Sequence, residues 1–227
     1  MSQVTRFAAL LCLLITCAAS AAEAQVSAAV QVPLETNTGW GPIKAPAGYK
    51  TLRVQGISPA NAFVLARLFA DFAAHPSMFP RVVDGVDILA CEGSSLKARY
   101  RTVFDPKPGG KTMVESLTTV RASVVQDRIE FIWSSDKVES SYVNAAWGRA
   151  LFVTRRTANG SSETLIDYVS AVRPKNSAKG VLVESQKSVL ANDARYVIDR
   201  LMAAARPHTA TDVNVAANAP MFACSAK

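Results

Sequence analysis

The stretch GVLVESQKSVLANDARYVIDRLM, residues 180–202, decides the fold of this 227-residue chain. Its apolar side chains recur every three or four residues, so they share one face of a single long helix over about 180–205. A helix this amphipathic must bury its apolar face, and the preceding chain has to supply the partner. The residues on that face are Leu182, Val189, Leu190, Ala194, Val197, Ile198, Leu201 and Met202.

A series of predicted strands supplies that partner. Between residues 82 and 172, β-branched and aromatic runs are separated by turn signals such as Glu92-Gly93-Ser94 and Asn159-Gly160, a pattern typical of an antiparallel meander. Because each connection is short, neighbouring strands should pair directly. We expect six strands, at about Val82–Cys91, Leu96–Phe104, Thr112–Val120, Arg128–Ser134, Tyr142–Thr154 and Glu163–Val172.

A strand and a helix precede the meander. Residues 49–56 alternate apolar and polar side chains as a short strand does. Ser58 and Pro59 then supply a helix cap and a proline at the first helical position, and His75-Pro76 should end the helical segment. This order predicts an α+β fold in which a curved antiparallel sheet wraps around the long C-terminal helix, with two short helices after the first strand. The gap between sheet and helix is a natural place for a small ligand.

The first 24 residues have the features of a secretory signal peptide. One basic residue, Arg6, precedes an apolar run from Phe7 to Ser20, and the cleavage pattern Ala22-Glu23-Ala24 follows. The apolar run is too short to span a bilayer. We therefore expect an exported, periplasmic protein with a signal peptide over 1–24, an extended N-terminal leader over 25–48, one domain over 49–206 and an irregular C-terminal tail over 207–227.

Two cysteines stay in the exported chain. Cys12 and Cys17 lie in the signal peptide, which leaves Cys91 and Cys224 in an oxidising compartment. A disulfide between them would tie the C-terminal tail to the body of the fold and stabilise it by about 2–4 kcal/mol. The alternative is two free thiols, because the sequence does not fix the distance between the two residues.

The composition weighs against several classes of function. The formal net charge of +7 can favour an anionic membrane surface, but no block of Lys and Arg is interleaved with aromatic residues, so we expect no nucleic-acid partner. Two isolated histidines and two distant cysteines offer no pair of metal ligands, and we expect no metal. The segment 108–112 ends like a phosphate-binding loop, but Asp105 stands where that loop needs a glycine.

Alternation along the predicted strands indicates which aromatic side chains point inward. Tyr100 shares a face with Ala98, opposite Arg99, so it should face the core. Phe131 and Trp133 share one face of their strand, which makes them core residues or cavity wall.

Three polar residues are candidates for chemistry. Both faces of the sheet stay open for Glu115 and Asp167, and an inward carboxylate would be a candidate general acid or base. His75 has Asp71 as its one partner nearby in the sequence, four residues earlier on the same helix face. We interpret His75 as a turn residue rather than a catalytic one.

Taken together, these segments resemble the START-like helix-grip superfamily, also called SRPBCC, which includes polyketide cyclases, aromatases, lipid carriers and coenzyme Q-binding proteins. The resemblance covers about residues 49–205 and rests on Ser58-Pro59, ADFAAHPSMFPRVVDGVDIL (70–89), AAWGRALFV (145–153), Arg173-Pro174 and the C-terminal helix. It implies a seven-stranded antiparallel sheet that grips this helix around an apolar cavity. It also implies that lipids, sterols, quinones or polyketides bind there without a metal or organic cofactor.

The resemblance leads to three functional hypotheses. The first is an exported binding or transport protein for a hydrophobic small molecule (a lipid, isoprenoid or quinone), in transient contact with anionic membrane. The second is a cyclase-like or lyase-like enzyme that uses Glu115 or Asp167 with Tyr100 or Tyr168. The third is a ligand-free interaction module of an envelope complex. We expect Met78 and Phe79 to form an apolar gate, and the ligand-binding residues to be Met78, Phe79, Tyr100, Phe131, Trp133, Trp147, Tyr168, Leu190 and Ala194.

Overall fold

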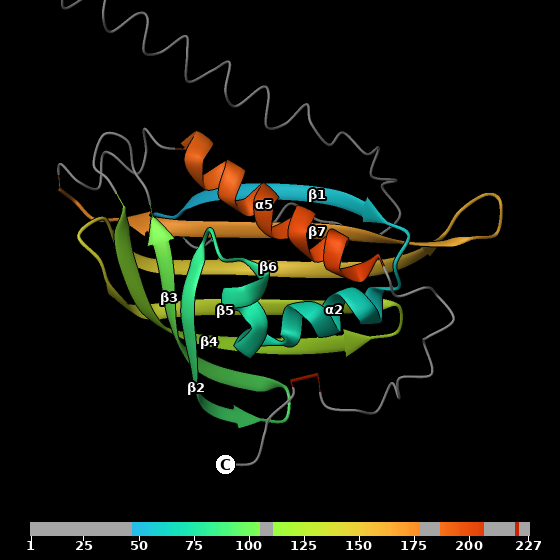
Figure 1. The fold of residues 1–227 in the computed structure, drawn as a ribbon, viewed down its shortest axis with the longest axis horizontal. Helices are drawn as coiled ribbons and strands as arrows, with labels where there is room; N and C mark the ends of the chain where they lie inside the picture. The colour runs from blue at the N-terminus through green and yellow to red at the C-terminus, as the bar shows by residue number, and fades with distance from the viewer. Residues whose placement is uncertain (1–46, 105–110, 178–186, 207–220, 223–227) are drawn as a thin grey trace, which may run out of the picture. The chain divides into compact units, whose positions relative to one another are not determined.

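The structure is a computed structural model that describes residues 47–104, 111–177, 187–206 and 221–222. The predicted order of elements is confirmed, from a first strand through short helices and a meander to a long helix (Figure 1). The helical elements are α2 (Ala62–Ala70), the 3₁₀ turn η2 (Phe72–Ala74), α3 (His75–Met78) and α5 (Lys187–Ala205). The strands are β1 (Lys50–Ser58), β2 (Val83–Glu92), β3 (Ser95–Phe104), β4 (Thr112–Val125), β5 (Arg128–Glu139), β6 (Val143–Arg156) and β7 (Ser162–Pro174).

The seven described strands form one antiparallel sheet in the order β1-β7-β6-β5-β4-β3-β2. Strands β2 to β7 follow one another as a meander, and β1 joins the sheet beside β7, where Lys50 pairs with Val172. Two of the predicted turns contain a glycine in the left-handed region, Gly93 with φ 56° and Gly160 with φ 83°. Glycine adopts this conformation without the strain that a Cβ atom would cause, so the turn chemistry fixes both hairpins.

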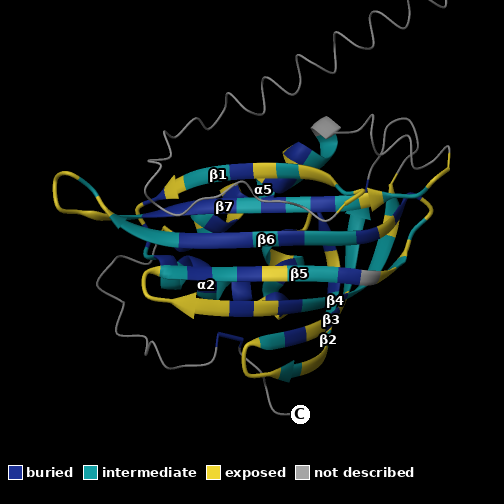
Figure 2. Cartoon of the chain, turned by 180° about the vertical axis from the view of Figure 1, so that it is seen from behind, coloured by how far each residue is buried: buried dark blue, intermediate teal, exposed yellow. Residues whose placement is uncertain are grey.

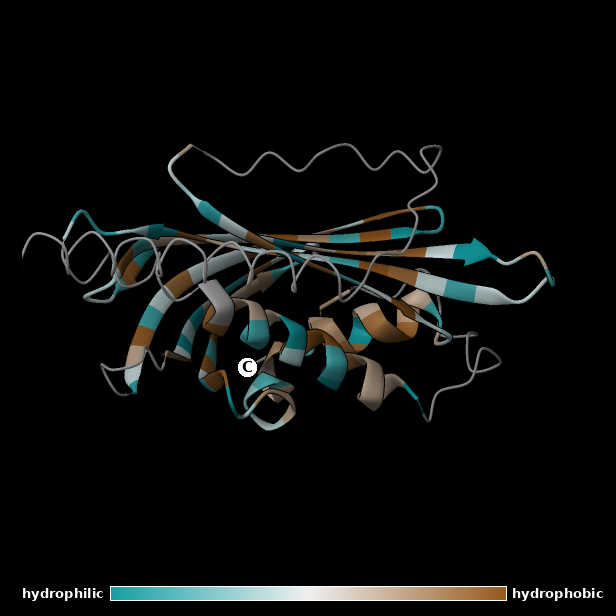
Figure 3. Ribbon diagram, turned by 90° about the horizontal axis from the view of Figure 1, so that it is seen from above, coloured by the Kyte–Doolittle hydropathy of each residue, from teal (hydrophilic) through white to brown (hydrophobic). Residues whose placement is uncertain are grey.

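Helices α2 and α5 cover one face of the sheet. Helix α5 contacts β1, β7 and α2, while α2 contacts β5, β6 and β7. Figure 3 shows both helices on the same side of the strands, and Figure 2, seen from behind, shows exposed residues at the hairpin ends and at scattered positions along the strands. The main core lies between sheet and helices, and its largest fully buried side chains include Phe79, Phe131, Phe152, Phe222, Leu65, Ile129, Ile166, Ile198 and Leu201.

The predicted start of the first helix is wrong. Strand β1 continues through Ser58, which pairs with Thr164 of β7, so Ser58 cannot cap a helix at Pro59. The cap is Asn61, whose side-chain oxygen accepts a hydrogen bond of 2.7 Å from the backbone N–H of Phe63. Asparagine is a strong capping residue because its short side chain reaches an amide that the first turn leaves unpaired.

Several predictions concern residues outside the described ranges. The signal peptide and almost all of the leader lie there, as do Leu182 and most of the C-terminal tail. Cys91 is disulfide-bonded, but its expected partner Cys224 is among these residues, so the pairing stays a prediction. Within the tail Phe222 is described, and its buried ring packs against the core. No helix in the described part of the chain is long and apolar enough to cross a membrane.

Candidate functional site

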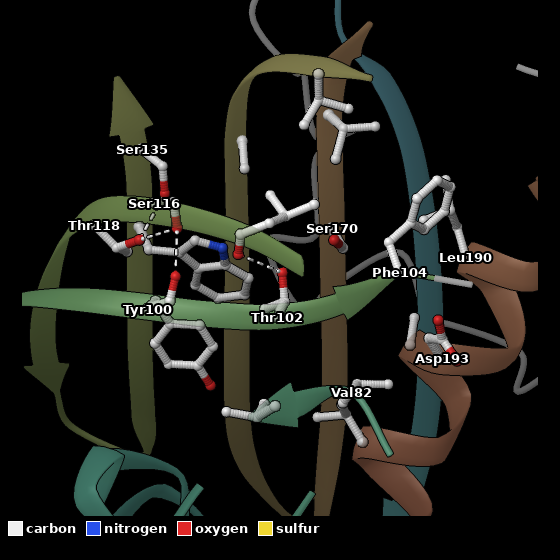
Figure 4. A pocket seen from close by; sticks show the side chains of 18 of the residues that line it. Val82, Tyr100, Thr102, Phe104, Ser116, Thr118, Ser135, Ser170, Leu190 and Asp193 are labelled. Atoms are coloured by element: carbon white, nitrogen blue, oxygen red, sulfur yellow. Dashed lines mark hydrogen bonds between the residues drawn. The ribbon is translucent and has the colours of Figure 1, made fainter. Parts of the chain in front are cut away.

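A cavity of about 250 Å³ lies between the sheet and the helices, at the place where the sequence predicts a ligand. Its walls come from α2, α5, the η2–α3 turn and all seven described strands (Figure 4). Most of the lining is aromatic or aliphatic, with hydroxyl groups on the sheet side. The described lining includes Leu52, Phe69, Phe72, His75, Phe79, Val82, Val83, Tyr100, Thr102, Phe104, Val114, Ser116, Thr118, Trp133, Ser135, Tyr142, Tyr168, Ser170, Leu190, Asp193, Ala194 and Val197.

Six of the nine predicted ligand-binding residues line this cavity. Strand alternation or helix spacing points most of them into it, and Phe79 reaches it from the turn after α3. Whether they bind a ligand stays a prediction. They are Phe79, Tyr100, Trp133, Tyr168, Leu190 and Ala194.

The other three predicted residues do not line the cavity. Met78 is partly buried against the core beside it. Phe131 is fully buried, with its ring centroid 5.1 Å from Phe69 and 6.0 Å from Phe222, so it belongs to the solid core. Trp147 is absent from the lining, because its neighbour Ala146 lines the cavity and successive residues of a strand point to opposite faces.

The inward-facing residue after Trp147 is Gly148, and a side chain of the neighbouring strand β5 fills the space beside it. A Cβ atom built on Gly148 would lie 2.0 Å from Cζ2 of Trp133, far closer than any non-bonded contact. Gly148 and Trp133 face each other across the β5–β6 pairing. The indole of Trp133 therefore occupies the volume that a side chain at 148 would need.

Replacing Gly148 with alanine will lower the free energy of unfolding by about 1–3 kcal/mol, because the added methyl group overpacks the wall against Trp133. Urea denaturation of both proteins measures the loss. The double variant Gly148→Ala/Trp133→Leu should recover part of it, since leucine leaves room for the methyl group. Equal losses with and without the indole would contradict this account.

His75 lies at the turn between η2 and α3, but Asp71 is not its hydrogen-bond partner. Its ring is 2% exposed and lines the cavity. Nδ1 of His75 lies 2.6 Å from the hydroxyl of Tyr100, and Nε2 lies 2.8 Å from the backbone oxygen of Phe69. The Asp71 carboxylate instead accepts a hydrogen bond from the backbone N–H of Ala74. The structure thus joins a histidine and a tyrosine that are 25 residues apart.

Burial keeps both members of this pair uncharged. Desolvation by burial lowers the pKa of His75 to about 4, against the opposing effects of the Phe69 carbonyl and Asp71. Burial also raises the pKa of the Tyr100 phenol well above its ordinary value, with a smaller contribution from Tyr168. At neutral pH the pair is therefore a neutral imidazole and a neutral phenol.

A second polar group lies on the sheet side of the cavity. The Thr118 hydroxyl is 2.7 Å from that of Ser135 and 3.1 Å from that of Ser116, which donates to the backbone oxygen of Tyr100 at 3.4 Å. Figure 4 shows this chain of hydroxyls on one side of the cavity and Phe104 on the other. The hydroxyls satisfy one another, so this wall is polar without being charged.

The two carboxylates proposed for catalysis do not reach the cavity. Glu115 is 38% exposed and lies 3.2 Å from Arg99. Asp167 is fully buried but points to the opposite face of β7 from Tyr168, where Arg53 donates to both of its oxygens, at 2.6 and 3.2 Å. The hypothesis of an enzyme with either carboxylate in the cavity is therefore wrong.

Charged side chains in the described lining are restricted to Lys50 and Asp193. Lys50 is exposed, and Asp193 accepts a hydrogen bond of 2.7 Å from Arg81. Arg81 also lies over the ring of Tyr196, 4.5 Å from its centroid, so the turn after α3 is held against α5.

Within the described ranges, no three His, Cys, Asp or Glu side chains are grouped as metal ligands.

Solved structures share this architecture. The aromatase/cyclase Zhui from Streptomyces sp. R1128 has a TM-score of 0.53 and 12% identity, over 70% of this chain and 94% of that one. A STAR-related lipid transfer protein from Xanthomonas axonopodis has a TM-score of 0.52 and 14% identity, over 74% and 99%. A START superfamily protein from Mycobacterium smegmatis has a TM-score of 0.50 and 16% identity, over 70% and 99%.

Neither the protein-family models nor the curated proteins give a match. Identities of 12–16% among the solved structures support a shared fold and do not transfer an activity or a ligand. The chain has the helix-grip fold that START superfamily proteins and aromatase/cyclases share.

Proposed function

We propose that this protein is exported to the periplasm, where it binds or carries a hydrophobic small molecule in the cavity between the sheet and α5. The observation that supports this most strongly is the chemistry of the cavity. Its described walls are mainly aromatic and aliphatic, and its buried polar groups are uncharged hydroxyls and an imidazole. Such a site favours a ligand that leaves water or a membrane, because burial of hydrocarbon is its main source of affinity.

The proposed mechanism is transfer by desolvation. Each methylene group that moves from water into the cavity gains about 0.8 kcal/mol, so a short apolar chain or a ring system is held usefully. The net charge of +7 would assist transient docking on an anionic membrane, a contribution that salt screens. A lipid, an isoprenoid or a quinone has the required apolar body.

Native mass spectrometry of the protein, purified from its own cells without detergent, tests the proposal. We expect the chain to be recovered in the periplasmic fraction with Gln25 as its first residue, and to carry an apolar molecule that organic solvent extracts. A protein that carries no such molecule and binds none of a broad panel of lipids, isoprenoids and quinones would refute the proposal.

A cavity-filling variant provides the control. Ala194 lies on α5, is 5% exposed and lines the cavity, so Ala194→Phe should occupy ligand space. The variant should lose the extracted molecule while its circular dichroism spectrum stays that of the parent. Retention of the molecule at the parent's level would place the ligand outside this cavity.

A further inference from the structure

We infer that the cavity selects a neutral apolar ligand that carries a hydroxyl group, an alcohol or a phenol, whose O–H donates a hydrogen bond to the oxygen of Tyr100. This inference rests on the proposed function and deepens it by naming the chemical class of the ligand. It depends on which atoms of the buried His75–Tyr100 pair already donate their hydrogen in a hydrogen bond, and which oxygen can still accept one.

The backbone carbonyl of Phe69 fixes the protons of the pair. A carbonyl oxygen can only accept, so Nε2 of His75, 2.8 Å away, carries the hydrogen and donates it. A neutral imidazole then has a bare lone pair on Nδ1. The Tyr100 hydroxyl, 2.6 Å from Nδ1, must therefore be the donor in that contact.

The neutral state of the imidazole follows from its surroundings. Three phenylalanine rings enclose His75, with centroids 4.5 Å (Phe72), 5.0 Å (Phe79) and 5.7 Å (Phe69) from its own. An imidazolium there would be buried among apolar rings without a paired carboxylate, which is costly. Tyr100 consequently offers the cavity an oxygen that can accept a hydrogen bond, while its own hydrogen is committed to His75.

Tyr168 supplies the complementary group. Its phenol lines the same cavity, its ring lies 5.6 Å from that of Trp133, and it has no hydrogen-bond partner among the described residues. Its O–H can donate to a ligand oxygen. A hydroxyl ligand both donates and accepts and can thus use either tyrosine. An ether or a ketone only accepts, so it gives the Tyr100 oxygen no donor.

The charges around the cavity favour a neutral ligand. The interior polar groups of the described lining are uncharged, and Lys50 and Asp193, one of each sign, are the charged members. Asp193 is already paired with Arg81. An ionised carboxylate or phosphate that entered as far as Tyr100 would lose its hydration without gaining a buried counter-charge.

Three probes of similar size separate these chemistries: 2-naphthol, which donates and accepts; 2-methoxynaphthalene, which only accepts; and 2-naphthoate, which is charged at neutral pH. Isothermal titration calorimetry of the ligand-stripped protein measures each affinity. We expect 2-naphthol to bind about tenfold more tightly than 2-methoxynaphthalene, the ratio that one hydrogen bond contributes, and 2-naphthoate to bind more weakly than both.

Matched variants assign the preference to Tyr100. Tyr100→Phe removes one oxygen and should bring the affinity ratio of the first two probes close to one. Tyr168→Phe removes a hydroxyl from the same cavity but leaves the pair intact, so the ratio should persist. His75→Phe frees the Tyr100 hydrogen, which can then donate to an ether, and should lower the ratio by strengthening 2-methoxynaphthalene. A purely structural role of His75 would weaken all probes alike.

The outcomes separate the two proposals. Equal binding of 2-naphthol and 2-methoxynaphthalene, or a preference that survives Tyr100→Phe, would overturn the inference and leave the apolar binding function standing. Tighter binding of 2-naphthoate would overturn it as well. Failure of all three probes to bind would count against the cavity as a binding site, and the inference would fall with it.

Discussion

Replacing Phe79 with alanine will lower the free energy of unfolding by about 3–5 kcal/mol, the range for a large aromatic side chain removed from a packed interior. Phe79 is 1% exposed, and its ring centroid lies 5.0 Å from that of His75. Its backbone N–H donates to the backbone carbonyl of His75 at 2.7 Å, and its own carbonyl accepts from the backbone N–H groups of Val82 and Val83 at 2.9 Å. The residue thus anchors the turn that leads into β2. Guanidinium denaturation of the parent and the variant measures the loss.

The adjacent Met78 provides the matched control for this prediction. Met78 is only partly buried and does not line the cavity, so Met78→Ala should cost much less. Equal losses for the two variants would contradict the structural role given to Phe79. In this structure Phe79 is 1% exposed and forms part of the cavity wall, and its expected role as an apolar gate stays a prediction.

Acid will destabilise the protein through His75. The pKa of this residue is about 4 in the folded chain, below the ordinary value of 6.5 that an exposed histidine has in the unfolded chain. The unfolded chain therefore takes up the proton first as the pH falls. The stability that the neutral ring contributes is complete above pH 6.5 and is lost progressively toward pH 4, by about 3 kcal/mol over that interval.

Comparison of the unfolding free energies of the parent and of His75→Phe at about pH 7 and about pH 4 isolates this effect, because the other titrating groups are common to both proteins. The parent should lose about 3 kcal/mol more than the variant. Equal losses in the two proteins would show that the pKa of His75 is not lowered in the folded chain.

Most of the fold could be predicted from local patterns. Turn residues such as Gly93 and Gly160 punctuate the meander, so the number and order of strands are visible in the sequence. Strand length was less visible. β4 continues to Val125 and β5 to Glu139, beyond the predicted ends, because the strands pair with each other further than the short apolar runs in the sequence indicate.

The site was only partly predictable because its polar pair is a tertiary contact. Local sequence offered Asp71 as the partner of His75, whereas the actual partner, Tyr100, lies on β3 and is brought near by the turn from α3 into β2 and by the β2–β3 pairing. Trp147 was misplaced for a related reason. The size of a side chain does not indicate its direction when Trp133, on the neighbouring strand, already fills the inner space.

The position of β1 in the sheet has a consequence for folding kinetics. Strands β2 to β7 can assemble through successive short hairpins, but Lys50 of the first strand pairs with Val172, near the end of the last strand. Contacts of such high sequence separation carry a large loop-closure cost and form slowly. During synthesis β1 remains without its partner until β7 has been made, and the newly formed edge of β7 stays open to other chains. The vulnerable interval for aggregation is therefore the time before this last strand pairing closes.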